Sequence, residues 1–176
     1  MRDFQLPGRS AVRATGAMAA TSHPLATQAA IDLLRRGGNA VDAAICAAAV
    51  QAVVEPQSTG IGGDCFVLYC PAGGSEVIAL NGSGRAPAAA TIDWYRAQGF
   101  DALPTYGVHS VSVPGAVDAW CRLSADHGRL PLAEALAPAI RHAEQGYVVH
   151  DRVASDWAES VDLLAADPHS AAIFLP

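Results

Sequence analysis

Apolar residues recur at helical spacing in the segment 25–34. The apolar set is Leu25, Ala26, Ala29, Ala30, Leu33 and Leu34, and the polar set between them is Thr27, Gln28 and Asp32, followed by Arg35 and Arg36. The segment 21–24 supplies two hydroxyls and then a proline, which is typical of a helix start. Gly37 and Gly38 supply a C-terminal cap. The pattern predicts an amphipathic helix with one buried face.

A second helix is predicted from Ala40 to Val54, with Asn39 as its N-cap and Pro56 ending it. Asp42 and Gln51 are the only polar residues within it. A helix that is apolar all round is expected to be buried on every side.

Two strands follow, at 65–70 and 76–80, joined by the Pro- and Gly-containing loop 71–75. They predict a β-hairpin. Short strands are also predicted near 16–20 and at 108–113, where valines alternate with polar residues.

The remaining pattern is helical. Helices are predicted at 116–127, at 132–145 with an interruption or kink at Pro138, and at 152–165. The last of these places Val153, Trp157, Val161 and Leu164 on one face. Helices flanking a few adjacent strands predict a layered α+β fold.

Composition narrows the class of protein. Of the 176 residues 51% are hydrophobic and 16% are charged, which excludes a disordered chain. The net charge is −6, and the 11 basic residues, all arginine, form no basic run, so we expect neither a nucleic-acid nor a membrane partner. The longest apolar run ends at Val54 and falls short of the roughly twenty residues of a membrane span. Residues 1–10 lack the apolar core of a signal peptide, so a cytoplasmic location is expected.

The four cysteines, Cys46, Cys65, Cys70 and Cys121, contain no C-x-x-C pair and are expected to be free, buried thiols. His and Cys residues show no metal-ligand spacing, so we expect no metal site and no cofactor.

Two loops are candidates for ligand binding. The glycines of 60–64 suggest a tight turn with positive φ or the lining of a small-molecule site. Their order of helix, loop and strand does not fit a dinucleotide fingerprint. In the loop 81–87, Arg85 either offers a fork to a carboxylate or is a solvated surface arginine.

The residue types of a Ser/His/Asp triad are also present, at Ser22-His23, His109-Ser110 and Asp118. The sequence has no G-x-S-x-G elbow, so a triad is not expected. Instead His23 is expected to cap or pack at the start of its helix, His109 to lie on a strand face, and His142 to be a solvated helix residue. These patterns alone identify no nucleophile.

Several strings nevertheless closely resemble the gamma-glutamyltransferase family over about residues 15–176. They are Gly-Gly-Asn-Ala-Val-Asp-Ala-Ala at 37–44, Val-Glu-Pro at 54–56, Gly-Ile-Gly-Gly at 60–63, Ser-Val-Pro-Gly-Ala-Val at 112–117 and Leu-Ala-Pro-Ala-Ile at 136–140. Together these motifs are highly specific.

The resemblance implies an N-terminal-nucleophile hydrolase with an αββα sandwich. Such a proenzyme cleaves itself into two subunits, and the threonine that begins the small subunit attacks an amide and forms an acyl-enzyme. Residues 1–176 then correspond to the N-terminal portion of the large subunit, an incomplete domain with no catalytic residue of its own. Its expected partners are a small-molecule amide substrate, the remainder of the large subunit and the small subunit. The alternative is a truncated, non-catalytic binding or structural module.

One departure from the family bears on the substrate. When Ala86-Pro87 is aligned with the Ala-Pro of gamma-glutamyltransferases, Ser83 stands where they carry the arginine that clamps the substrate's α-carboxylate. Arg85 lies two residues later, so either Arg85 has taken over the clamp or the clamp is missing. Asp64 also interrupts a run that is glycine in the transferases. Both features resemble hydrolase branches such as oxamate amidohydrolases and cephalosporin-acylase-like proteins, and we predict Ser83 and Arg85 as substrate-binding residues.

Overall fold

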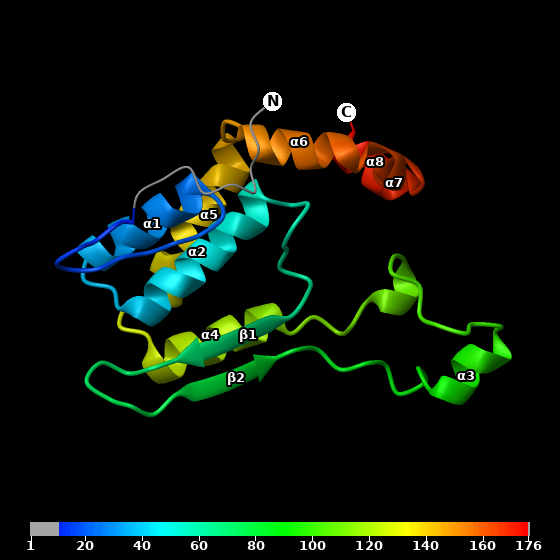
Figure 1. Cartoon of the computed structure of the whole chain (residues 1–176), viewed down its shortest axis with the longest axis horizontal. Helices are drawn as coiled ribbons and strands as arrows, with labels where there is room; N and C mark the ends of the chain where they lie inside the picture. The colour runs from blue at the N-terminus through cyan, green and yellow to red at the C-terminus, as the bar shows by residue number, and fades with distance from the viewer. Residues whose placement is uncertain (1–10, 176) are drawn as a thin grey trace.

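Three helices lie side by side in one layer of the computed structural model, which describes residues 11–175 (Figure 1). They are α1 (Pro24–Arg35), α2 (Ala40–Val54) and α5 (Leu132–Gln145), with α2 in contact with both of the others. The layer holds most of the hydrophobic core, including Leu33, Cys46 and Val50, each 0% exposed. The three helices have the predicted bounds to within a residue, and α5 continues through Pro138 as a single element.

α1 buries the predicted face, with Ala26, Ala29, Ala30 and Leu33 inside. His23 caps its first turn, because Nδ1 accepts a hydrogen bond from the Leu25 N–H at 3.1 Å. Gly37, with φ of 99°, follows its C-terminus as predicted.

α2 begins with a capping box that also reaches across the fold. The Asn39 side chain accepts from the Val41 and Asp42 N–H groups, and the Asp42 carboxylate accepts from the Asn39 N–H at 2.8 Å. Asp42 is 1% exposed and also accepts the N–H groups of Arg129, at 3.1 Å, and Leu130, at 3.3 Å. We call this set of contacts the Asp42 junction. It ties the start of α2 to the segment that leads into α5.

The sequence predicts that α2 is buried on every side. This prediction is wrong, because Ala40 and Ala44 are exposed. These two alanines lie between two hollows. One, of about 450 Å³, is bounded by the first strand of the hairpin, and the other, of about 410 Å³, by residues 17–21. The strand predicted near 16–20 is wrong: within residues 11–175 this segment pairs with no other strand.

The hairpin forms as predicted from β1 (Cys65–Tyr69) and β2 (Ile78–Gly82), which pair antiparallel with Val67 opposite Leu80. Cys65, Val67 and Leu80 pack toward the core, as does Trp120 of α4 (Ala116–His127). The other face of β1 is open: Phe66 is 69% and Leu68 is 79% exposed. Within the described residues the sheet therefore has helices on one face only.

Residues 85–112 extend away from this body and carry the short helix α3 (Ile92–Ala97), which the sequence pattern missed (Figure 1). The predicted strand at 108–113 is wrong, since Val108–Ser110 form one turn of 3-10 helix. His109 is half-buried there, against the rings of Trp94, Tyr95 and Phe100, rather than on a strand face. Aromatic packing thus replaces the sheet pairing that the alternating valines predict.

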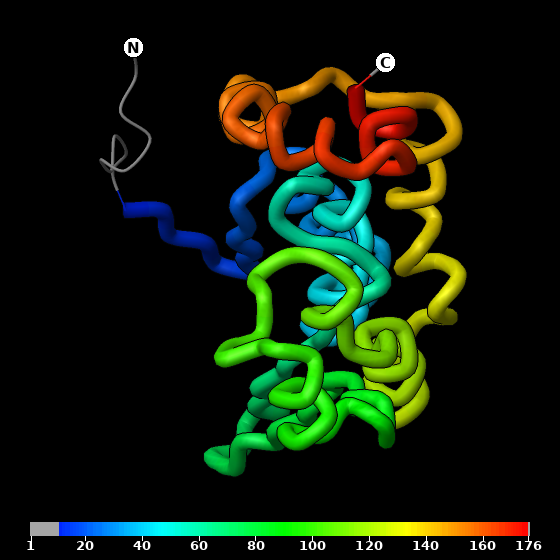
Figure 2. Tube along the Cα trace, turned by 90° about the vertical axis from the view of Figure 1, so that its right-hand side faces the viewer, coloured from blue at the N-terminus to red at the C-terminus, as the bar shows by residue number. Residues whose placement is uncertain are grey.

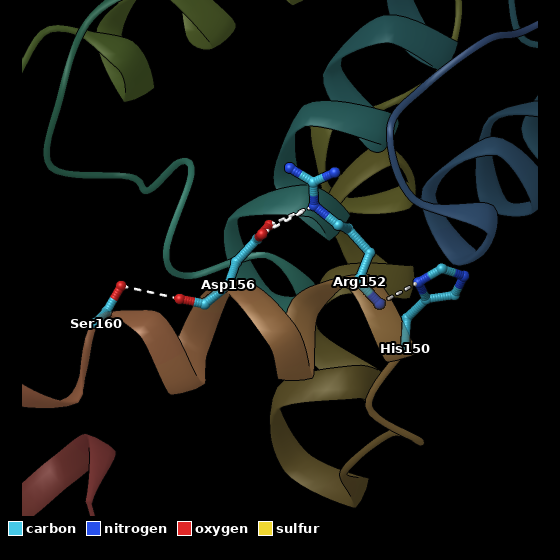
Figure 3. A network of polar contacts seen from close by, with 4 residues as sticks. All are labelled: His150, Arg152, Asp156 and Ser160. Atoms are coloured by element: carbon cyan, nitrogen blue, oxygen red, sulfur yellow. Dashed lines mark hydrogen bonds and ion pairs between the residues drawn. The ribbon is translucent and has the colours of Figure 1, made fainter. Parts of the chain in front are cut away.

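The C-terminal helices lie at the opposite end of the helical layer from the hairpin (Figure 2). They are α6 (Asp151–Glu159), α7 (Val161–Ala165) and α8 (Pro168–Phe174). The single helix predicted for 152–165 is divided at Ser160, whose hydroxyl donates back to the Asp156 carbonyl at 3.0 Å (Figure 3). The Ser160 N–H bonds to Trp157 and ends α6, which leaves Val161 exposed instead of on the predicted common face.

The start of α6 is held locally. His150 Nδ1 accepts from the Arg152 N–H at 3.2 Å, and Arg152 Nε donates to both Asp156 carboxylate oxygens at 2.8 and 2.9 Å (Figure 3). These contacts join the N-cap and the first turns of one helix.

Candidate functional site

Three loops meet at the end of the hairpin where β1 begins and β2 ends. They are 60–64 before β1, 83–85 after β2 and 112–115 before α4. The Gly63 carbonyl accepts the N–H groups of Gly115 at 3.1 Å and Ala116 at 3.0 Å, and the Val113 N–H donates to the Arg85 carbonyl at 3.0 Å. Backbone hydrogen bonds therefore fix each loop against another.

Glycines allow this close approach. A Cβ on Gly84 would overlap the Val113 carbonyl, and one on Gly115 would overlap the Gly82 carbonyl. Residues 61–63 form a turn as predicted, but none of the glycines of 60–63 has the predicted positive φ. The turn brings the Gly63 carbonyl to the N–H groups at the start of α4.

Asp64 links two of the loops through its side chain. Its Oδ1 accepts from the Gly84 N–H and from the Ser112 hydroxyl, each at 3.0 Å. We call this set the Asp64 junction. The hydrogen bond from Gly84, followed by that from Ser112, holds the pKa of the Asp64 carboxyl below its ordinary value. The residue that interrupts the glycine run in the sequence therefore provides an ionised carboxylate at the meeting point of the loops.

An open cavity of about 770 Å³ lies beside this junction. Both predicted binding residues, Ser83 and Arg85, line it. From α4 it receives Asp118 and Arg122, which form an ion pair at 2.9 Å that the sequence reasoning missed. Asp118 and Arg122 are four residues apart, a spacing at which a helix pairs opposite charges and which is visible in the sequence. Arg85 and Arg122 are both exposed, and a guanidinium group of this kind can bind a carboxylate in a bidentate manner.

The structure does not assemble a Ser/His/Asp triad from the predicted residues. His23 caps α1 and is 2% exposed, with burial lowering its pKa. His109 packs among aromatic rings, and Asp118 pairs with Arg122. His142, predicted to be solvated, is half-buried with its ring 6.3 Å from that of Tyr147.

The cysteines form no disulfide within the described residues. All four cysteines are free, but only Cys46 is fully buried, and burial raises the pKa of its thiol to about 11. Cys70 and Cys121 are exposed, contrary to expectation. Residues 11–175 contain no group of three or more His, Cys, Asp or Glu side chains arranged to hold a metal ion. None of the described helices has the length and apolarity to cross a membrane.

Comparison with known proteins gives consistent matches. The profile of the family described as Gamma-glutamyltranspeptidase matches residues 26–176. A glutathione hydrolase-like proenzyme of Bacillus subtilis (strain 168) is 40% identical over 161 residues, which is 91% of this chain and 30% of the relative. The oxamate amidohydrolase proenzyme of Klebsiella pneumoniae is 40% identical over 160 residues, covering 88% of this chain and 30% of the relative.

Solved structures of similar fold come from the same family and related acylases. The gamma-glutamyltranspeptidase of Helicobacter pylori superposes with a TM-score of 0.83 at 32% identity, covering 92% of this chain and 47% of that one. A cephalosporin acylase from Bacillus halodurans gives 0.78 at 45% identity, covering 94% and 32%. The chain spans about a third of the length of the curated relatives that it matches.

Proposed function

Because the chain belongs to the gamma-glutamyltranspeptidase family, we propose that it is the N-terminal part of the large subunit of an amide hydrolase or acyltransferase. The relatives it matches are named as hydrolase or acylase proenzymes, and it spans about a third of their length. The nucleophile in this proposal is a threonine beyond residue 176, exposed as a new N-terminus when the proenzyme cleaves itself.

The proposed chemistry divides between the two parts. The threonine hydroxyl attacks the amide carbonyl while its own α-amino group takes the proton, and the leaving amine departs protonated. An oxyanion hole in the small subunit stabilises the tetrahedral intermediate. Water or an acceptor amine then releases the acyl group. The chain described above contributes substrate binding rather than bond cleavage.

The uncovered surfaces support an incomplete domain. Ala40 and Ala44 of α2 face two hollows, and Phe66 and Leu68 of β1 are open on the other side of the hairpin. In the proposed αββα sandwich, further strands extend the sheet beneath α2 and a second sheet covers Phe66 and Leu68. Burying apolar side chains of this size stabilises a fold by about 1.5–3 kcal/mol each.

The cavity at the Asp64 junction is the observation that carries the binding role. Ser83 and Arg85 both line this open cavity, which supports a site for a small amide with a carboxylate. Ser83 lacks the guanidinium fork that a gamma-glutamyl α-carboxylate requires. We therefore propose a small amide acid such as oxamate as the preferred substrate, with Arg85 binding its carboxylate.

The test is to express the reading frame that continues past residue 176 and to identify the cleaved subunits by mass spectrometry. We expect a small subunit that begins with threonine, good turnover of oxamate and poor turnover of a gamma-glutamyl anilide. Arg85→Ala should raise the KM for oxamate. Absence of a threonine-initiated segment, together with a monodisperse 176-residue chain that unfolds cooperatively, would instead establish a non-catalytic module. Efficient glutathione hydrolysis that Arg85→Ala abolishes would show that Arg85 clamps a gamma-glutamyl group.

A further inference from the structure

We propose that Asp64 is the positioning residue of the substrate loop, fixing the backbone of Ser83–Arg85 so that the Arg85 side chain is presented at the open cavity. The proposal rests on the proposed carboxylate-binding role of that cavity, and it adds a residue that touches no substrate itself.

The contacts of Asp64 single out this loop. Its Oδ1 accepts the N–H of Gly84, which lies between the two predicted binding residues, and the hydroxyl of Ser112, 48 residues beyond Asp64. One oxygen atom thus connects the loop that follows β2 to the segment that precedes α4. Asp64 is the residue directly before β1, so the hairpin anchors its backbone.

The neighbouring backbone leaves the loop little room to shift. Gly84 packs so closely on the Val113 carbonyl that a Cβ would overlap it, and the Val113 N–H bonds to the Arg85 carbonyl at 3.0 Å. Residue 84 is held by Asp64 and residue 85 by Val113. A binding group whose backbone is already ordered loses less conformational freedom when its ligand arrives.

The choice of an aspartate fits the solvent-exposed position. Water competes for the Gly84 N–H and the Ser112 hydroxyl, and an ionised acceptor competes better than a neutral one. The same donors lower the pKa of Asp64, so the acceptor stays ionised to lower pH than an ordinary aspartate. Ser83 adds a local restraint, because its N–H donates to the Asn81 side chain at 2.9 Å.

The test compares three variants of the protein encoded by the reading frame that continues past residue 176, by amide NMR, with oxamate as the probe. Asp64→Ala removes the acceptor, and Asp64→Asn keeps an oxygen at Oδ1. Asp167→Ala is the matched control, since Asp167, the N-cap of α8, is also exposed and accepts a backbone N–H, that of Ser170 at 2.8 Å. The readouts are hydrogen exchange at the Gly84 amide and the dissociation constant of oxamate.

We expect Asp64→Ala to speed exchange at Gly84 and to weaken oxamate binding about tenfold, the effect of one or two lost hydrogen bonds. Asp64→Asn, which keeps a neutral acceptor, should restore part of both readouts, and Asp167→Ala should change neither. Unchanged exchange at Gly84 in Asp64→Ala would overturn the positioning role. So would an Asp64→Asn variant as impaired as Asp64→Ala.

Arg85→Ala separates this proposal from the one on which it rests. If oxamate binds the chain equally well with and without Arg85, the proposed carboxylate site is wrong, while the exchange data still decide what Asp64 holds. If Arg85→Ala abolishes binding and Asp64→Ala leaves it intact, the site stands and the positioning role of Asp64 is wrong.

Discussion

Two aspartates in this chain have the same kind of partner and opposite surroundings. Asp42 accepts the N–H groups of Arg129 and Leu130, and Asp64 accepts the N–H of Gly84, in each case from a segment far along the chain. Asp42 is 1% exposed, whereas Asp64 is exposed to solvent. When a buried acceptor is removed its donors remain without partners, but exposed donors turn to water. The Asp42 junction therefore supports the stability of the fold, while the Asp64 junction supports the geometry of a loop.

The largest effect should follow from Asp42→Ala. It leaves the N–H groups of Asn39, Arg129 and Leu130 without their acceptor in the interior. We expect a loss of about 3 kcal/mol in the free energy of unfolding. Urea denaturation followed by circular dichroism measures it. A loss under about 1 kcal/mol would mean that burial does not distinguish the two junctions.

Gly84→Ala should have the next largest effect, because the new methyl group would meet the Val113 carbonyl. We expect about 2 kcal/mol of destabilisation, typical of overpacking against backbone. Gly62→Ala, at a loop glycine with open space around it, is the control and should cost much less. Equal unfolding midpoints for the two variants would show that the loops at the Asp64 junction are not closely packed.

The pH dependence of the Asp64 junction should be confined to acid. The pKa of Asp64 in the folded chain lies below the ordinary value of about 3.9. The support that the ionised Asp64 gives to the loop 83–85 is therefore fully present above that ordinary pKa. It is lost as the pH falls through the lowered pKa of the folded chain. The Gly84 amide chemical shift, followed from pH 6 to strong acid, should titrate below about pH 4. A midpoint above that ordinary value would contradict the hydrogen bonds described for Asp64.

Asp64→Ala should have the smallest effect on stability. Since its donors are open to water, we expect the thermal unfolding midpoint to match that of the parent chain within experimental error. The same variant should still change oxamate binding. A marked fall in the midpoint would place Asp64 with Asp42, as a residue that the fold requires.

Local signals explain which elements could be predicted. The helices from Ala116 and Leu132 have the predicted bounds because each carries its own periodicity, and the uniformly apolar helix from Ala40 has them because Asn39 starts it and Pro56 stops it. The α3 helix also has a local start signal in the sequence, which was not used to predict it. This signal is the N-cap residue Thr91, whose side chain accepts a hydrogen bond from the Trp94 N–H. The segment 108–113 has strand-like alternation, but a strand needs a partner, and pairing is a non-local property.

Some residues of the candidate site could likewise be predicted from local sequence, and others could not. Arg85 and Ser83 could be proposed from one loop and its resemblance to a family, and in the structure both line one cavity. Asp64 could not be given a role, because its partners lie 20 and 48 residues away. Asp42 appears in the sequence as a lone polar residue in an apolar helix, and only the folded chain shows the segment that it holds.

The reach of the Asp42 junction has a consequence for the order of folding. Asp42 and Arg129 are 87 positions apart, so their contact closes a long loop, and the entropic cost of closing a loop grows with its length. The capping-box bonds of Asn39 and Asp42 join near neighbours, so α2 has its own start before α5 arrives. We expect the contact to Arg129 to form after the transition state, so that Asp42→Asn speeds unfolding far more than it slows refolding.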